Sequence, residues 1–596
     1  MTFTTRPELT GTFGMAASTH WIASAVGMAM LEKGGNAFDA AVAMGFALHV
    51  VEPHLNGPLG DMPLIFCPAG DDVPTVICAQ GVAPAKATIA HYKAEGLDLI
   101  PGSGMLATVV PGAFDGWMLL LRDHGTMTLR EVLEPAIHYA EAGHPMLERV
   151  SATISGLANF FADEWPTSAA LWTPGGKVPQ KDDLFRNPDL AATWHRLLSE
   201  AEAKRGREAQ IDAARDAFYR GFVAEKIGKW VEEAEVMDAA GGRRKGVLSA
   251  DDMANWHASY EAPLSVDYHD WTVFKTGPWG QGPALLQSLQ TLKHSNVASL
   301  DPGSADFVHL VTETMKLSFA DREAYYGDPL HTDIPMGALL SDAYAAERAA
   351  LIGPKASLTQ RPGRLPGFEA WADAAIARAA MQAQAGPGAG AGEPTMAHLT
   401  EKRGDTVHVD VIDRWGNMVS ATPSGGWLQS SPVVPGLGMP LNSRAQMFWL
   451  TEGLPTSLVP GRRPRTTLSP SMANYRGRPT LAFGTPGGDQ QDQWQLIYFL
   501  RLVHATRNLQ EAVDQPLFHT AHFQASFYPR GCRPGHLMIE PSFGEATIAE
   551  LRARGHEIEV AEPWTVGRLT AASRDPKGVL RAAATPRLMQ AYAVGR

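Results

Sequence analysis

Apolar residues recur at intervals of three and four along much of the chain, the spacing of helices that pack one face against a core. The stretch from residue 15 to residue 54 is dense in small and apolar side chains and predicts two deeply buried helices. Gly34, Gly35 and Asn36 interrupt this stretch in the manner of a helix C-cap. The same spacing predicts further helices at 129–142, 189–204, 209–236, 303–325 and 490–507.

A strand is predicted where apolar and polar positions alternate, and the clearest case is GDTVHVDVIDRWGN at 404–417. One face of this strand carries three valines: Val407, Val409 and Val411. The other face carries His408, Asp410 and Ile412, and a turn over 414–417 closes the strand. The pattern explains every position except the threonine at its start, Thr406.

Composition adds the class of protein. With 596 residues, the chain has the length of about four domains of ~150 residues or of one large layered α/β unit. Hydrophobic residues make up 45% and charged residues 19%, as in a soluble globular protein. The formal net charge of -12 argues against partners such as nucleic acid or an anionic membrane surface, because no basic stripe is present.

Cysteine usage and the N-terminus indicate the compartment. Cys67, Cys78 and Cys532 are too few for a disulfide framework and have no CxxC spacing, so buried thiols in a reducing compartment are expected. The first residues contain neither a signal peptide nor an apolar run long enough to span a membrane. We therefore expect a cytoplasmic protein.

An Ala/Gly/Pro tract, MQAQAGPGAGAGEPT at 381–395, is the strongest shift of composition. Such a tract buries too little apolar surface to offset its ordering entropy, so we expect a mobile linker. It ends about ten residues before Thr406 and would leave that junction accessible.

Three segments carry candidate chemistry. The Thr406 hydroxyl could act as a nucleophile with its own α-amine as the base, at a pKa of about 7.7 to 8.0, if the preceding bond were cut. Gly487 and Gly488 lie between a predicted strand and helix, where backbone N–H groups can hold an oxyanion. Thr466 and Thr467 form a hydroxyl pair. Each segment also has an ordinary explanation: β-branching at a strand start, a tight turn, and turn capping.

The segments together resemble the γ-glutamyltransferase family of N-terminal-nucleophile hydrolases. The motifs of the second half are TVHVDVIDRWGN, RPRTTLSP and TPGGDQQ, in the family's order and spacing. The first half agrees through LEKGGNAFDAAVA, VVEPH, VAPAKAT, VPGAFDGW and FADREAYYGDP, so the resemblance covers nearly the whole chain.

The resemblance implies an αββα four-layer sandwich made as a proenzyme that cuts itself between Asp405 and Thr406. The products would be a large subunit, 1–405, and a small catalytic subunit, 406–596, which stay associated in one αββα unit. A dimer of these heterodimers is compatible with the family. The resemblance implies no cofactor and no metal, and a small-molecule amide as substrate.

The resemblance also assigns roles to site residues. Thr406 would attack an amide carbonyl, and the N–H groups of Gly487 and Gly488 would hold the oxyanion. Ser424 stands where the family usually has a second threonine that orients the amine. His408 is expected to pack structurally.

Substrate binding is where the sequence departs from the family. Gln80 stands in place of the arginine that holds a glutamyl carboxylate, and Met447, beside Gln446, in place of the acid that holds its ammonium. Gly426 replaces an asparagine near the nucleophile, while Thr466 and Thr467 replace a serine pair.

Two arginines are new in these stretches, Arg444 and Arg465, and either could meet a singly anionic substrate. The chain thus resembles the amidohydrolase and acylase branch more than true transpeptidases.

Two other functions remain open, a true γ-glutamyl transpeptidase or glutathione hydrolase, and an uncleaved relative that serves as a binding protein. Metal hydrolysis has weak support from HVVEPH (49–54) and from His519 and His522, because neither offers a third ligand nearby. GPGAGAG lacks the strand and helix of a dinucleotide-binding loop.

Overall fold

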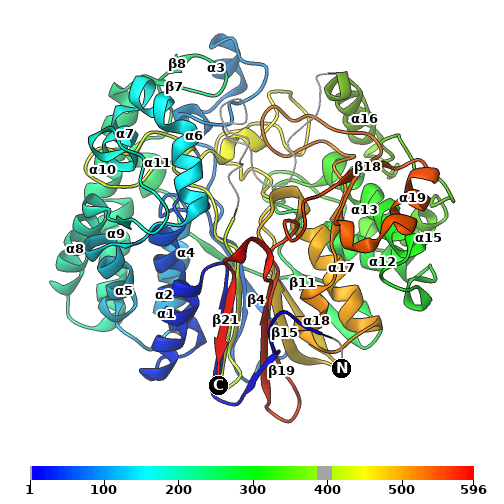
Figure 1. Cartoon of the computed structure of the whole chain (residues 1–596). Coiled ribbons are helices and arrows are strands. Elements are labelled where there is room, and N and C mark those ends of the chain that lie inside the picture. Colours follow the sequence, from blue (N-terminus) through cyan, green and yellow to red (C-terminus); the bar gives the residue numbers. More distant parts are fainter. Residues whose placement is uncertain (1–2, 385–405) are drawn as a thin grey trace.

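Two seven-stranded sheets lie face to face between two layers of helices in the computed structural model, which describes residues 3–384 and 406–596. Figure 1 shows the helical layers on the left and right, with the strands between them. Every strand pairing within the two sheets is antiparallel. The αββα sandwich expected from the resemblance is confirmed.

Each sheet combines strands that are distant in sequence. The first sheet has the order β1 (Leu9–Gly11), β20 (Leu580–Ala584), β19 (Thr570–Arg574), β15 (Arg478–Gly484), β14 (Ser471–Tyr475), β11 (Trp271–Lys275) and β10 (Leu264–Tyr268). The second has the order β21 (Tyr592–Gly595), β2 (Gly14–Ser18), β12 (Val409–Asp413), β13 (Met418–Ala421), β3 (Leu64–Cys67), β4 (Thr75–Cys78) and β9 (Ser259–Glu261).

The helical layers cover the outer faces of the sheets. The layer on the second sheet contains α1 (Trp21–Glu32), α2 (Ala37–Val51), α4 (Ala113–His124), α5 (Leu129–Ala142), α8 (Pro188–Glu202), α9 (Arg207–Tyr219) and α10 (Phe222–Glu233). The layer on the first sheet contains α12 (Pro283–Leu292), α13 (Ala305–Tyr325), α15 (Asp342–Ala349), α16 (Glu369–Gln384), α17 (Gln491–His504), α18 (Leu509–Asp514) and α19 (Glu545–Ala553). Among the described helices, none combines the length and the apolarity needed to cross a bilayer.

The alternating pattern of β12 is explained by the layers on its two sides. Val409 and Val411 pack into the core under α1 and α2, whereas Ile412 belongs to the smaller apolar core between the two sheets. His408 and Asp410 face that inter-sheet space as well and are fully buried. The facing predicted from the sequence is therefore confirmed.

The predicted helices are present, with two differences. Residues 14–18 form β2 instead of extending a helix, because their small side chains fill a central position between β21 and β12. The stretch 209–236 contains two helices, α9 and α10, which meet at Gly221. A Cβ there would lie 2.9 Å from the carbonyl oxygen of Ala217, so the glycine permits this close junction.

The two sheets are joined at one end, where the candidate site lies. Thr570, the first residue of β19, donates a hydrogen bond of 2.7 Å to Asp410 in β12. Thr570 pairs with Gly484, the last residue of β15. Thr406, which precedes β12, and Gly487, which follows β15, therefore lie beyond the same end of the sandwich.

The expected linker falls largely outside the described residues. Its first four residues, 381–384, form the last turn of α16, which corrects the prediction of a linker from 381. The remainder of the tract, 385–395, and Asp405 at the predicted cleavage point lie outside the described part of the chain.

Candidate active site

Thr406 lies three residues before the start of β12 and is fully buried. Its Oγ1 lies 3.2 Å from the Oγ of Ser424, to which it donates a hydrogen bond. The N–H of Val407 donates to the carbonyl of Pro423, so the pairing of β12 with β13 continues to the nucleophile candidate. The structure thus brings together two hydroxyl residues that are 18 positions apart in the sequence.

The Ser424 backbone is held by Asp61, a residue that the sequence reasoning missed. The two residues exchange backbone hydrogen bonds of 2.9 and 3.0 Å. The Asp61 carboxylate accepts a hydrogen bond of 2.9 Å from Arg444 in a buried ion pair. Burial raises the pKa of Asp61, and Arg444 opposes that rise. No sequence spacing links residue 61 to residue 424, because the contact is tertiary.

The loop after Ser424 requires glycine for steric reasons. Gly425 and Gly426 have φ values of 74° and 65°, which L side chains rarely adopt. A Cβ on Gly426 would also lie 3.1 Å from the Gly60 nitrogen. Gly426 is therefore matched to a close approach of two backbone segments.

Met447 lies in a buried apolar wall. Met447 packs with Trp427 and Phe527 in a small buried cluster. The Arg444 guanidinium lies over the Trp427 ring at 5.3 Å, and its Nη1 is 3.9 Å from the Met447 sulfur. None of the three cluster members carries a carboxylate, and among the described residues Arg444 beside them is ion-paired with Asp61.

The glycine turn follows β15 and leads into α17. Gly487 has φ 134° and Gly488 φ 57°, and a short 3-10 turn, Gly488–Gln490, precedes the helix. The Gly488 carbonyl accepts a hydrogen bond of 3.0 Å from the Gln281 side chain. This bond fixes the peptide plane between Gly488 and Asp489. A Cβ on Gly487 would lie 2.2 Å from the Trp494 ring. The turn is rigidly held, as an oxyanion-binding turn must be.

A buried ionic network clamps this turn from α13. Arg322 donates to Gln281 at 2.8 Å and to Asp489, the residue after Gly488, at 2.5 Å. Ser526 donates to the same carboxylate. Arg322 lies in the stretch FADREAYYGDP, which the sequence analysis matched to the family. The motif drew attention to this arginine but did not indicate which residues it contacts.

The threonine pair and its preceding arginine are buried in a neighbouring loop. Thr466 pairs through its backbone with Trp279, and its hydroxyl accepts from the N–H of Leu468. Thr467 is fully buried. Arg465 contacts Glu323 at 2.9 Å, and burial lowers its pKa to about 10. Arg465 is thus already matched by an acid.

Gln80 makes no hydrogen bond to the other predicted site residues within the described chain. Both atoms of its amide are buried without a hydrogen-bond partner among the described residues. It lines a cavity of about 230 Å³ together with Cys78, Trp256 and Arg463. The structure does not join Gln80 to Thr406 by a direct contact.

His408, two residues after Thr406, is held between the sheets. Its ring nitrogens lie 2.9 Å from the Thr422 hydroxyl and 3.0 Å from Asp410. Asp410 in turn accepts from Thr570, so the ring belongs to the bonds that tie the two sheets together.

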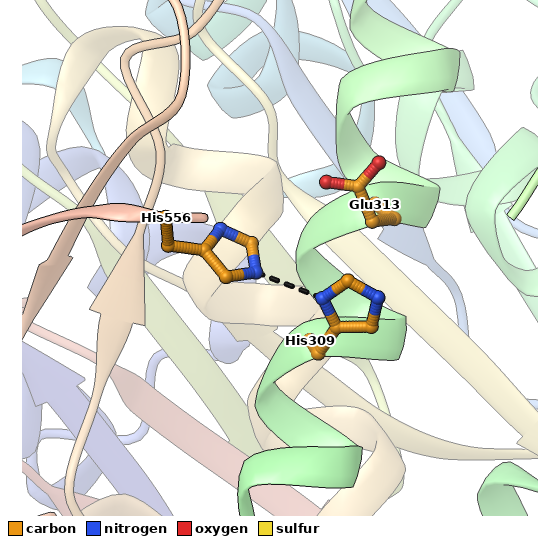
Figure 2. A group of neighbouring side chains, drawn as sticks. All are labelled: His309, Glu313 and His556. Carbon is orange, nitrogen blue, oxygen red and sulfur yellow. Dashed lines mark hydrogen bonds between the residues drawn. The ribbon is translucent and has the colours of Figure 1, made fainter. Parts of the chain in front are cut away.

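One group of three potential metal ligands occurs among the described residues: His309, Glu313 and His556 (Figure 2). The imidazoles bond to each other at 2.8 Å, and a carboxylate oxygen of Glu313 lies within 4.8 Å of a nitrogen of each ring. That carboxylate is bound by Lys316 at 2.6 Å and Arg361 at 3.0 Å. Glu313 is the only acid of the group, and Lys316 and Arg361 already compensate its charge. The group is therefore a poor site for a metal cation.

The comparisons with known proteins agree with this geometry. The family described as Gamma-glutamyltranspeptidase matches residues 23–595. The chain is 32% identical to the Acylase ACY 1 proenzyme of Pseudomonas sp. (strain SE83), over 96% of this chain and 92% of that protein. It is 31% identical to the Oxamate amidohydrolase proenzyme of Klebsiella pneumoniae subsp. pneumoniae, over 97% of each chain.

Solved structures give the same result. The structure of LmbA2991HD is 54% identical to this chain, covers 100% of both chains and superposes with a TM-score of 0.92. The cephalosporin acylase of Bacillus halodurans is 26% identical and has a TM-score of 0.82, over 100% of this chain and 97% of that one. This chain therefore belongs to the γ-glutamyltranspeptidase family of N-terminal-nucleophile hydrolases.

Proposed function

We propose that the protein is a self-cleaving N-terminal threonine amidohydrolase that hydrolyses a small amide or N-acyl substrate through an acyl-enzyme on Thr406. The observation that carries this proposal is the position of Thr406. Its hydroxyl is 3.2 Å from Ser424, at the end of the sandwich where the Gly487–Gly488 turn also lies. The relatives named as acylase and oxamate amidohydrolase proenzymes support the same chemistry.

Maturation would cut the chain between Asp405 and Thr406. The Thr406 hydroxyl attacks the carbonyl carbon of residue 405, the C–N bond breaks in an N-to-O acyl shift, and water then hydrolyses the ester. The new α-amine of Thr406 becomes the base for the next reaction. Chains of 405 and 191 residues result. Each of the two sheets contains strands from both sides of the cut, which explains why the two chains would stay together.

In turnover, the Thr406 hydroxyl attacks the substrate amide and passes its proton to its own amine, which protonates the leaving amine. Gly487 and Gly488 N–H groups would stabilise the tetrahedral oxyanion, and Ser424 would orient the Thr406 side chain and amine. Water then releases the acyl group by the same steps in reverse order. No cofactor enters this mechanism.

The substrate is proposed to lack a γ-glutamyl head. Gln80, Gly426 and Met447 stand where the family's polar anchors would be, and the wall around Met447 is apolar. Each absent charge-assisted hydrogen bond forfeits about 1.5 to 3 kcal/mol, so two such losses weaken binding by at least about a hundredfold. Thr466 and Thr467 would remain as neutral hydroxyl groups that can hydrogen-bond to the substrate.

A glutathione hydrolase or γ-glutamyl transpeptidase is the second candidate, because the family includes the Glutathione hydrolase proenzymes of Bacillus subtilis and Escherichia coli. The two activities are separated by assaying a γ-glutamyl anilide against simple N-acyl anilides, each with and without glycylglycine. Efficient γ-glutamyl turnover stimulated by the dipeptide would overturn the proposed substrate class. A Gln80→Arg, Met447→Asp double variant should move activity towards the glutamyl compound.

Self-cleavage is tested on freshly purified protein by intact mass and N-terminal sequencing. Two fragments are expected, the smaller beginning Thr-Val-His-Val. Thr406→Ala should remain one inactive chain, whereas Thr406→Ser should cleave slowly because a hydroxyl remains. A stable full-length protein without amidase activity would instead favour a non-catalytic binding protein, and a full-length protein with full activity would refute the mechanism.

A further inference from the structure

A cavity of about 510 Å³ lies at the end of the first sheet away from Thr406 and takes no part in the mechanism above. Its walls come from the β10–β11 turn, the start of β15, the C-terminus of α17 and the end of β19. The opposite ends of β15 and β19 reach the candidate active site, because Gly487 follows β15 and Thr570 begins β19. The length of these strands therefore separates the cavity from the active site.

One part of the wall is aromatic and aliphatic. Trp271 and Tyr475 are partners in the pairing of β11 with β14, and their ring centroids lie 5.0 Å apart. Both rings are half-buried. Three buried leucines add aliphatic surface to the same cavity: Leu481, Leu502 and Leu509. Small-molecule sites are usually cavities of about 300 to 1,000 Å³ with such apolar walls and a few converging polar groups.

Two arginines at this cavity have no acidic partner within the described residues. Arg507, in the loop between α17 and α18, is exposed and forms no hydrogen bond or ion pair with any described residue. Arg574 ends β19, and its Nε is buried without a hydrogen-bond partner in the described part of the chain. A guanidinium binds carboxylate or phosphate oxygens through its planar set of N–H donors, and buried polar groups normally have a partner. The two arginines therefore give the cavity positive charge that no described acid compensates.

The two acids among the described residues of the wall are already matched. Asp270 pairs with Arg476 at 2.9 Å. Asp575 pairs with Arg581 at 3.1 Å and also accepts a hydrogen bond of 2.8 Å from the N–H of Lys577. Neither carboxylate is thus available to Arg507 or Arg574, and the charge balance of the cavity favours an anion.

His504 adds a polar group to the cavity. Its Nε2 lies 2.9 Å from the Tyr268 hydroxyl, and its ring centroid lies 5.1 Å from that of His269. Burial lowers the pKa of His504 to about 4, and His269 adds to that shift, so the ring is neutral at neutral pH. Its Nδ1 has no hydrogen-bond partner among the described residues and can bond to a ligand atom.

We propose that this cavity is a second binding site, which takes a small planar aromatic anion. The ring of the ligand would pack against Trp271 and Tyr475, where aromatic pairs gain more than their buried area alone provides. Its carboxylate or phosphate would pair with Arg507 and Arg574. Aryl carboxylates and aromatic phosphates share this chemistry. The inference goes beyond the proposed amidohydrolase function and does not depend on it, because the cavity and Thr406 lie at opposite ends of the strands.

The test is isothermal titration calorimetry of wild-type protein in a phosphate-free buffer, with 2-naphthoate and phenyl phosphate as probes. At least one of the two should bind with a Kd below about 1 mM, and the tighter one identifies the anion. 2-Naphthamide lacks the charge and should bind about 10- to 100-fold more weakly than the naphthoate. Cyclohexanecarboxylate lacks the aromatic ring and should bind about 2- to 10-fold more weakly than the naphthoate.

Arg507→Gln should raise the Kd of the tighter probe by about 10- to 100-fold, and Arg507→Lys should retain part of the affinity. Because Arg507 is exposed and unpaired within the described chain, the thermal melting of both variants should match wild type. Arg552→Gln is the matched control, since Arg552 is an exposed arginine of α19 outside the cavity. This control should leave the Kd unchanged.

Three results would overturn the proposal. The first is that neither probe binds below about 1 mM. The second is that the amide or cyclohexanecarboxylate binds as tightly as the naphthoate, which would remove the anion or the aromatic ring from the ligand class. The third is a Kd that Arg507→Gln does not change, which would place the bound probe elsewhere on the protein.

Discussion

Replacing Gly487 with alanine tests the predicted oxyanion turn most directly. The added Cβ would lie 2.2 Å from the Trp494 ring, and tolerable contact begins at about 3.4 Å, so the turn and the ring must separate by about 1.2 Å (3.4 minus 2.2). The φ of 134° is also outside the range of alanine, and the peptide must rotate. A displacement of about 1 Å at reacting groups costs ~10²-fold in rate. Loss of one oxyanion donor costs ~10²- to 10³-fold, or about 2.7 to 4 kcal/mol.

We therefore expect Gly487→Ala to lower kcat by about 10²- to 10³-fold with a smaller change in KM, measured on the anilide that wild-type enzyme hydrolyses best. Gly477→Ala is the control. Gly477 also has a positive φ, 77°, in the β14–β15 turn, but an added Cβ there meets nothing within 4 Å. It should lose stability by about 1 to 2 kcal/mol and keep its kcat. A folded, cleaved Gly487→Ala enzyme with wild-type kcat would refute the assignment of the oxyanion hole to this turn.

Two further predictions concern stability. Asp328→Asn should lower the free energy of unfolding by about 3 kcal/mol, because Asp328 forms a buried pair with Arg463 at 2.7 Å, whereas Asp270→Asn in an exposed pair should cost at most about 1 kcal/mol. Urea unfolding compares the two, and equal losses would contradict the role of burial. Burial lowers the pKa of His556 to about 3, so the folded protein holds this ring neutral. The stability that the neutral ring contributes is fully present above pH 6.5 and is lost as the pH falls towards 3, because the unfolded chain binds a proton there first. His556→Gln, which keeps a donor for His309, should gain on wild type by up to about 1.4 kcal/mol per pH unit below pH 6.5, and parallel melting curves across that range would disprove this.

The sequence by itself determined the layers of this protein. Periodicity placed the helices, and the valines at 407, 409 and 411 share one face of the strand as predicted, the face that packs into the core under the helices. Motif order and spacing identified the family and singled out Thr406, Ser424, Gly487 and Gly488, because these positions are constrained locally by strand ends and turns. The helix prediction failed at residues 15–18 because a run of small side chains suits a buried helix and a central strand equally well.

The tertiary structure alone decided what surrounds those positions. Asp61 meets Ser424 and Arg444 across more than 360 residues, and no local pattern records such a contact. Arg444 and Arg465 read as available cations in the sequence, yet each lies against an acid supplied by a distant segment. Charge compensation depends on distances in space, which the order of residues along the chain does not specify.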